Sequence, residues 1–211
     1  MKDEKRIVRS YEFEVRAGHD EERGDQIQGR AIVFNAPTDV AGLFQEIIAP
    51  EALQKTDLRD VRFLVNHNRD MIPLARSRRN NANSTMQLMV GPEGMDIRVD
   101  LDTENNEQAR ALYSATKRGD ISGMSFAFRV DGEEWTGLDT NYPTRIIRSI
   151  EKVSEVSAVT WPQYEQTSLE ARDVEALESA RAALESAQQE TRRQQLIEEV
   201  KSLLKEVSNA D

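Results

Sequence analysis

The sequence predicts an α+β protein, with a strand-rich body over residues 1–165 and a helical C-terminal extension over 166–211. Three observations predict this class. Short segments of the body alternate apolar and polar residues, as half-buried strands do. Turn signals rich in glycine and proline separate these segments. The extension has no proline or glycine between 168 and 207 and consists largely of strong helix formers. Many short strands with few helices favour a barrel or a sandwich.

The predicted strands carry apolar residues and end at turn residues. In chain order they cover residues 11–15, 29–35, 44–48, 61–65, 74–77, 86–90, 95–101, 124–130, 144–150 and 153–159. The third of these segments, Phe-Gln-Glu-Ile-Ile, also fits a turn. The sequence Gly-Pro-Glu-Gly at 91–94 is a strong turn signal and predicts the clearest hairpin. We expect a polar loop at 18–24 and a stop after the last strand at Trp161 and Pro162.

Helices are predicted at three places. Pro50 opens the first, because proline is tolerated at the first position of a helix. The second covers 104–117 and ends in the glycine-containing segment 119–123. In the extension, two apolar stripes at a spacing of three or four do not share one heptad phase. They predict two amphipathic helices or one helix with a stutter, which either packs on its own domain or oligomerises or binds a partner.

The composition excludes several kinds of function. The chain has no cysteine and two histidines, His19 and His67, so disulfides, thiolate catalysis and Cys-based zinc sites are excluded. We therefore expect no metal and no cofactor. A net charge of −10 argues against general nucleic-acid binding, which needs clustered Lys and Arg. The N-terminal residues lack the apolar core of a secretory signal, and no stretch of 18 apolar residues exists. We expect a cytoplasmic protein without membrane contact.

The sequence offers candidate residues for catalysis by a serine nucleophile. Serine needs a base within hydrogen-bond reach, usually a histidine, and a third group that orients the imidazole. His67 closes an apolar strand and is the plausible base, whereas His19 lies in a charged loop. Ser125 begins a strand after Gly119 and a turn, with the aromatic residues of that strand on the opposite face. Ser122, inside the turn, is the rival nucleophile.

Several segments resemble the caudovirus prohead proteases, which are related to the herpesvirus assemblin proteases. A strand ending in Asn-His at 64–67, the turn and strand at 119–128 and the late strand at 155–162 carry the resemblance. Residues 29–35 and 44–50 look like earlier segments of that family. The resemblance spans about residues 10–165 and implies a mostly antiparallel β-barrel with surrounding helices.

The resemblance also implies roles for individual residues. His67 would be the general base and Ser125 the nucleophile. The assemblins use a second histidine as the third member, and this chain has none in the late strand, so a carboxylate must replace it. Glu155 matches best, and Glu151 or an acid such as Asp70 are alternatives. Oxyanion donors stay open between backbone N–H groups near Gly123 and an arginine, namely Arg129, Arg145 or Arg148.

The implied function is that of a serine endopeptidase in phage prohead maturation, acting in the host cytoplasm inside the assembling prohead. Its expected substrates are the scaffold portion of the major capsid protein and the protease itself, and the C-terminal helix is expected to bind scaffold helices, to form a homo-oligomer or to be removed by self-cleavage. The main alternative is a non-enzymatic assembly or scaffolding protein. An esterase fits less well, because Ala127 stands where the Gly-x-Ser-x-Gly elbow has its second glycine.

Overall fold

The computed structural model describes residues 6–11, 15–160 and 171–208. The strands are β1 (Arg6–Tyr11), β2 (Val15–Asp20), β3 (Gly24–Val33), β4 (Thr38–Val40), β5 (Phe44–Ile48), β6 (Arg62–Val65), β7 (Ala75–Arg76), β8 (Met86–Val90), β9 (Gly94–Asp100), β10 (Gly123–Thr136) and β11 (Thr144–Val159). The helices are the 3₁₀ turn η1 (Pro50–Leu53), α1 (Glu107–Arg118) and α2 (Ala171–Ser208). The predicted α+β class is confirmed.

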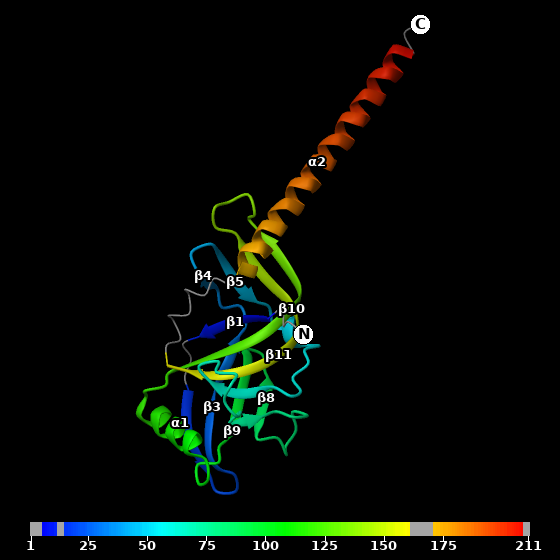
Figure 1. Cartoon of the computed structure of the whole chain (residues 1–211). Coiled ribbons are helices and arrows are strands. Elements are labelled where there is room, and N and C mark those ends of the chain that lie inside the picture. Colours follow the sequence, from blue (N-terminus) through cyan, green and yellow to red (C-terminus); the bar gives the residue numbers. More distant parts are fainter. Residues whose placement is uncertain (1–5, 12–14, 161–170, 209–211) are drawn as a thin grey trace.

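Two sheets make up the strand-rich body (Figure 1). The seven-stranded sheet has the order β1-β10-β11-β5-β4, with β6 paired to β11 and β7 paired to β6. The four-stranded sheet has the order β2-β3-β9-β8. Most pairs are antiparallel, but β5 and β6 run parallel to β11. A closed barrel is not formed in the described part of the chain, so that part of the prediction is wrong. Alternation along a strand predicts which face is buried, and it carries no information on whether two sheet edges meet.

Element boundaries differ from the sequence-based expectation where strands are longer than their apolar runs. The segments 144–150 and 153–159 are one strand, β11, whose pairing with β10 includes β-bulges. The expected loop at 18–24 holds the end of β2 and the start of β3, so only its centre is a turn. The predicted hairpin around 91–94 is confirmed as β8 and β9. The expected strand at 11–15 and the stop at Trp161 lie partly or wholly outside the described residues.

Helix α1 covers Glu107–Arg118, so it begins three residues after the predicted start at 104, and its capping residues explain both ends. The Asn106 side chain accepts hydrogen bonds from the amides of Gln108 and Ala109, which have no partner inside the helix. Gly119 ends the helix with a φ of 81°, the left-handed conformation that suits glycine. The proline-opened segment 50–53 stays a single 3₁₀ turn. Because α1 ends at Arg118, the chain can begin β10 at Gly123, and this strand carries Ser125.

The core lies between the two sheets. One continuous cluster joins Phe126 and Phe128 of β10 and Val156 of β11 to Ile27 of β3 and Ile97 of β9. All five side chains are at most 1% exposed. The two phenylalanine rings stack at 4.8 Å between centroids. Burial of such side chains contributes about 1.5–3 kcal/mol each. This packing fixes one face of β10 and β11 and leaves their other face for the residues described below.

Helix α2 is one uninterrupted helix, and its distal part projects away from the body (Figure 1). Near its base, Leu177 packs with Val40 and Phe44. Further along, Leu196 and Ile197 are 54% and 44% exposed. The helical character of the extension is confirmed, whereas its separation as a domain beginning at residue 166 stays a prediction. No helix in the described ranges is long and apolar enough to span a bilayer.

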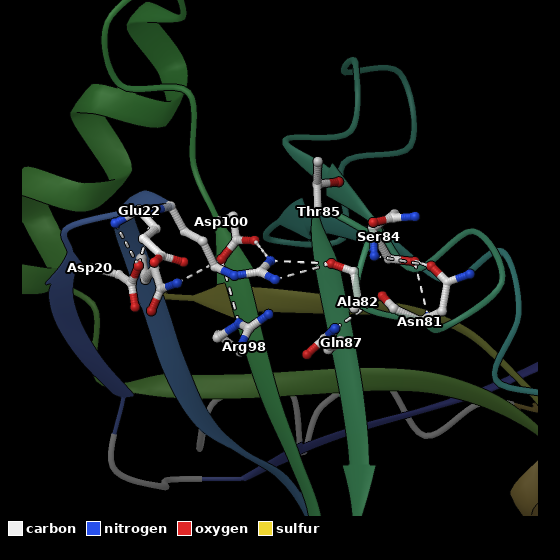
Figure 2. A network of polar contacts seen from close by, with 12 residues as sticks. Asp20, Glu22, Asn81, Ala82, Ser84, Thr85, Gln87, Arg98 and Asp100 are labelled. Atoms are coloured by element: carbon white, nitrogen blue, oxygen red, sulfur yellow. Dashed lines mark hydrogen bonds and ion pairs between the residues drawn. The ribbon is translucent and has the colours of Figure 1, made fainter.

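A network of polar contacts lies at one end of the four-stranded sheet (Figure 2). Arg23, in the turn between β2 and β3, donates to Asp100 Oδ2 at 3.1 Å and to the carbonyl oxygen of Ala82 at 3.2 and 3.3 Å. Gln26 donates to the other oxygen of Asp100 at 2.7 Å. Figure 2 shows Asp100 and Ala82 facing the same guanidinium. The network ties the β2–β3 turn to the long loop before β8.

We expect Gly94→Ala to lower the free energy of unfolding by about 2–3 kcal/mol, as overpacking of a dense site does. Gly94 has a φ of 155°, and an added Cβ would lie 1.9 Å from the carbonyl oxygen of Ile32. The matched control is Gly91→Ala, whose Cβ would meet no heavy atom closer than 4.0 Å. Urea unfolding of both variants measures the difference. Equal stabilities would show that the backbone of β3 around Ile32 moves away from the added Cβ without cost.

Candidate active site

His67 lies in a tight turn directly after β6. Asn66 and His67 have φ angles of 49° and 55°, a left-handed conformation that residues with a Cβ rarely adopt. The turn is fastened to the end of β11: the Asn66 amide donates to the carbonyl oxygen of Ala158 at 2.9 Å, and the Thr160 amide donates to Asn66 Oδ1 at 3.1 Å. These contacts offset the local strain and fix where the imidazole leaves the chain.

Four residues of β10 and β11 form the floor beneath this turn. Ser125 lies opposite Ser157, and Ala127 lies opposite Glu155. Directly opposed residues share a face of the sheet, and side chains alternate between faces along a strand, so all four point away from Phe126 and the core. Ser125 and Glu155 occupy diagonal corners of this square. The small side chains at the other two corners leave room for a ring above the sheet.

The imidazole of His67 bridges the two diagonal corners. Nε2 lies 2.6 Å from Ser125 Oγ, and Nδ1 lies 2.5 Å from Glu155 Oε1. The three residues come from distant parts of the chain, 58 and 88 positions apart. The His67 side chain is 13% exposed and that of Glu155 is 4% exposed, so water screens their interaction little.

This geometry suits proton transfer from a hydroxyl. A neutral imidazole with its hydrogen on Nδ1 donates to the Glu155 carboxylate and offers the Nε2 lone pair to Ser125. When Nε2 takes the serine proton, the positive ring stays paired with the carboxylate. A base between a nucleophile and an orienting acid is the arrangement that acyl transfer requires.

Ser125 Oγ also contacts the backbone of β1. It lies 2.8 Å from the carbonyl oxygen of Arg9, to which it can donate. Strand β1 pairs with β10 so that Ser10 lies opposite Ser125. The Ser125 side chain is fully buried, at 0% exposure. Two acceptors, one nitrogen and one carbonyl oxygen, are therefore within reach of a single hydroxyl hydrogen.

The alternative residues lie elsewhere. Ser122 is exposed in the segment before β10. The carboxylate of Glu151 binds Arg129 at 3.0 and 3.1 Å, and Asp70 is exposed in the loop after His67. His19 lies on β2 in the other sheet, where its ring contacts Asp25 at 2.9 Å. The structure thus brings together the three residues preferred from the sequence and keeps these alternatives apart from them.

The three arginines considered as oxyanion donors are all paired with carboxylates. Arg129 binds Glu151, as described above. Arg148 binds Glu134 at 2.9 and 3.0 Å and Glu51 at 2.9 Å. Arg145 is buried and binds Glu46 at 3.1 Å. Gly123 begins β10 two residues before Ser125, so the backbone near it stays the candidate donor closest in sequence.

Two residues near the nucleophile were not identified from the sequence. Ser157 is fully buried across from Ser125, and its hydroxyl makes no hydrogen bond among the described residues. Its position two residues after Glu155 places it on the same face, which strand alternation predicts once Glu155 is chosen. Arg9 approaches through its main chain, and no sequence pattern indicates such a contact. Among the residues that the structure describes, no group of three or more His, Asp or Glu side chains is arranged to hold a metal ion.

Comparisons with known proteins find one matching family model and two similar phage proteins. A family model described as caudovirus prohead serine protease matches residues 11–180. The prohead protease of Enterobacteria phage HK97 is 29% identical over 158 residues, which cover 73% of this chain and 63% of the HK97 protein. More than a third of the HK97 protein is thus unmatched. Among solved structures, the bacteriophage T4 capsid assembly protease aligns with a TM-score of 0.46 and 12% identity, over 74% of this chain and 97% of that chain.

The region matched by the family model runs from the end of β1 to the base of α2. It contains His67, Ser125 and Glu155, the three side chains joined by short contacts. Because the match extends over well more than half of its length, this chain belongs to the caudovirus prohead serine protease family.

Proposed function

We propose that this chain is a serine endopeptidase with Ser125 as nucleophile, His67 as general base and Glu155 as the group that orients and stabilises the imidazole. The observation that carries the proposal is the pair of contacts made by His67, at 2.6 Å to Ser125 Oγ and at 2.5 Å to Glu155 Oε1. Membership of a serine protease family supports the same assignment.

In the proposed reaction, Ser125 Oγ attacks the carbonyl carbon of a peptide bond while its proton moves to His67 Nε2. The tetrahedral intermediate collapses, the C–N bond breaks, and His67 gives the proton to the leaving amine. A water molecule then attacks the acyl-enzyme ester with His67 again as base. This step releases the new carboxyl group and returns the proton to Ser125. Glu155 stays ionised throughout and offsets the charge of the imidazolium.

We further propose that the substrates are the scaffold portion of the major capsid protein and the chain itself, cleaved inside the prohead in the host cytoplasm. The similarity to the prohead protease of phage HK97 motivates this part. The projecting helix α2, with Leu196 and Ile197 exposed, offers an apolar surface for scaffold helices or for a second copy of the chain. We also propose that the chain is related to the herpesvirus assemblin proteases.

A fluorophosphonate probe tests the proposed chemistry directly, because it reacts with activated serine hydroxyls. We expect one covalent label, mapped by peptide mass spectrometry to Ser125 and absent from Ser125→Ala. Ser122→Ala is the matched control, because it removes an exposed hydroxyl three residues away and should keep the label. A label on Ser122 would overturn the site, and a chain that never reacts while its fold is intact would favour the non-enzymatic assembly role.

A further inference from the structure

Ser157 lies between the nucleophile and the strand that precedes the general base. In the seven-stranded sheet, β11 separates β10 from β6, so Ser157 has Ser125 as its neighbour on β10 and Leu64 as its neighbour on β6. His67 follows β6 and reaches Ser125 Oγ at 2.6 Å. The His67 side chain must therefore cross β11 on the face that carries Ser157. This serine is part of the floor of the candidate site.

The hydroxyl of Ser157 is enclosed and makes no hydrogen bond among the described residues. Ser157 is 0% exposed, as is Ser125. A buried hydroxyl of this kind gives up its hydrogen bonds to water and gains none in return, so it makes the folded chain less stable than an alanine at the same place would. Such a group beside a nucleophile is a candidate for a role that arises only during the reaction.

Ser125 is the polar neighbour best placed to receive a hydrogen bond from Ser157. Directly opposed residues of an antiparallel pair have Cβ atoms about 4.5–5.5 Å apart, so rotation of a serine side chain can bring two facing hydroxyl oxygens to hydrogen-bond distance. Glu155 is two residues away along β11, a rise of about 6.7 Å, and its carboxylate is turned to His67 Nδ1 at 2.5 Å. On the β6 side, the buried side chain of Leu64 offers neither a donor nor an acceptor.

The oxygen of Ser125 changes in charge during the proposed reaction. Negative charge grows on Oγ as its proton moves to His67 Nε2, and it grows again when the acyl-enzyme ester breaks and Oγ leaves. A hydrogen-bond donor aimed at an atom where charge develops, in a site that excludes water, stabilises the transition state more than the ground state. Ser157 can supply such a donor at both stages by rotating its hydroxyl toward Oγ.

We propose that Ser157 is a further catalytic residue, which donates a hydrogen bond to Ser125 Oγ as this oxygen loses its proton and again as it leaves the acyl group. This role depends on the proposed function, because it needs Ser125 as the nucleophile. No proton leaves Ser157: the proton of Ser125 goes to His67, and the Ser157 hydroxyl only turns toward Oγ. The buried hydroxyl thereby gains its hydrogen bond in the reaction and not in the resting chain.

Ser157→Ala tests this role through the rate of fluorophosphonate labelling of Ser125. Loss of one hydrogen bond to a charged oxygen is expected to lower this rate about 10–100-fold. Ser157→Cys keeps a group of similar shape with a weak S–H donor, so we expect a rate between those of Ser157→Ala and the native chain. Ser154→Ala is the matched control, because Ser154 is a half-buried serine of the same strand and its loss should leave the rate unchanged.

Urea unfolding of the same variants separates a catalytic role of Ser157 from a structural one. Because its hydroxyl has no partner among the described residues, we expect Ser157→Ala to unfold at the same urea concentration as the native chain or at a higher one. Unfolding at a clearly lower concentration would overturn the proposal, since the hydroxyl would then be a stabilising contact of the resting fold.

The labelling rates distinguish failure of this role from failure of the proposed function. A reactive native chain with an equally reactive Ser157→Ala would overturn the role of Ser157 and leave the proposed function intact. A Ser157→Cys chain no faster than Ser157→Ala would also overturn that role, because the rate would not follow donor strength. A folded native chain that never reacts would contradict the proposed function, and the role of Ser157 would fall with it.

Discussion

Glu155→Gln is expected to lower the rate constant for labelling of Ser125 by roughly 10³–10⁴-fold, the loss seen when a serine–histidine pair is deprived of its carboxylate. A glutamine cannot balance the charge of the imidazolium, and its amide group can donate to Nδ1 and so stabilise the wrong tautomer. With the hydrogen on Nε2, His67 has no lone pair to receive the proton of Ser125. The 2.5 Å contact between Nδ1 and Glu155 Oε1 is the observation behind this expectation.

Glu151→Gln is the matched control. Glu151 lies on the same strand, but it is exposed and pairs with Arg129, so its loss should change the labelling rate less than about twofold. Labelling of Ser122→Ala serves as the reference rate. A Glu155→Gln chain that reacts as fast as the Glu151→Gln chain would show that Glu155 only fills space beneath the imidazole.

Glu46→Gln should lower the free energy of unfolding at pH 7 by about 3–5 kcal/mol, because it leaves two buried guanidinium groups short of a negative partner. Glu46 accepts from Arg9 at 2.6 and 2.9 Å and from Arg145 at 3.1 Å, and it is 1% exposed. Chemical denaturation measures the change. Glu51→Gln is the control, because the exposed Glu51 pairs with Arg148 at the surface and its loss should change the stability far less than the loss of Glu46.

The stability difference between the native chain and Glu46→Gln is expected to depend on pH. Burial alone raises the pKa of Glu46, but Arg9 and then Arg145 outweigh it, so the pKa lies below the ordinary value of 4.5. A carboxyl whose pKa is lower in the folded state stabilises the fold above the unfolded pKa, and this stabilisation is lost as pH falls through the folded pKa. The stability difference between the native chain and Glu46→Gln should therefore be full near pH 7 and shrink below about pH 4.5. A difference that stays constant down to acid pH would show that shape, not charge, is what Glu46 contributes.

Part of the candidate site could be predicted because its signals are local. Ser125 follows Gly119 and a turn and begins a strand with phenylalanines at alternate positions, so its face was predictable from period-two alternation. His67 was distinguished by its position at the end of an apolar strand. Glu155 was chosen over Glu151 through resemblance, and its place on the face of Ser125 became evident only from the pairing of β10 with β11.

Other features have no local signal. The barrel prediction was wrong because closure depends on whether distant strand edges meet. The long single strand β11 was predicted as two, since its bulges interrupt the alternation that a sequence displays. Arg9 was not considered at all, because its carbonyl oxygen contacts Ser125 across 116 positions and its guanidinium contacts Asp173 across 164.

By itself, the sequence determined the strand-rich body, the hairpin around 91–94, the end of α1 at the glycine-containing segment and the helical extension, since each depends on residues within about one turn or one strand of each other. Only the tertiary structure decided that β6 runs parallel to β11, which brings His67 over the diagonal between Ser125 and Glu155. It alone also paired β1 with β10, which brings the carbonyl oxygen of Arg9 to Ser125. Such contacts depend on which edges and faces meet in space, and the chain encodes this in the summed burial of the whole core rather than in any short pattern.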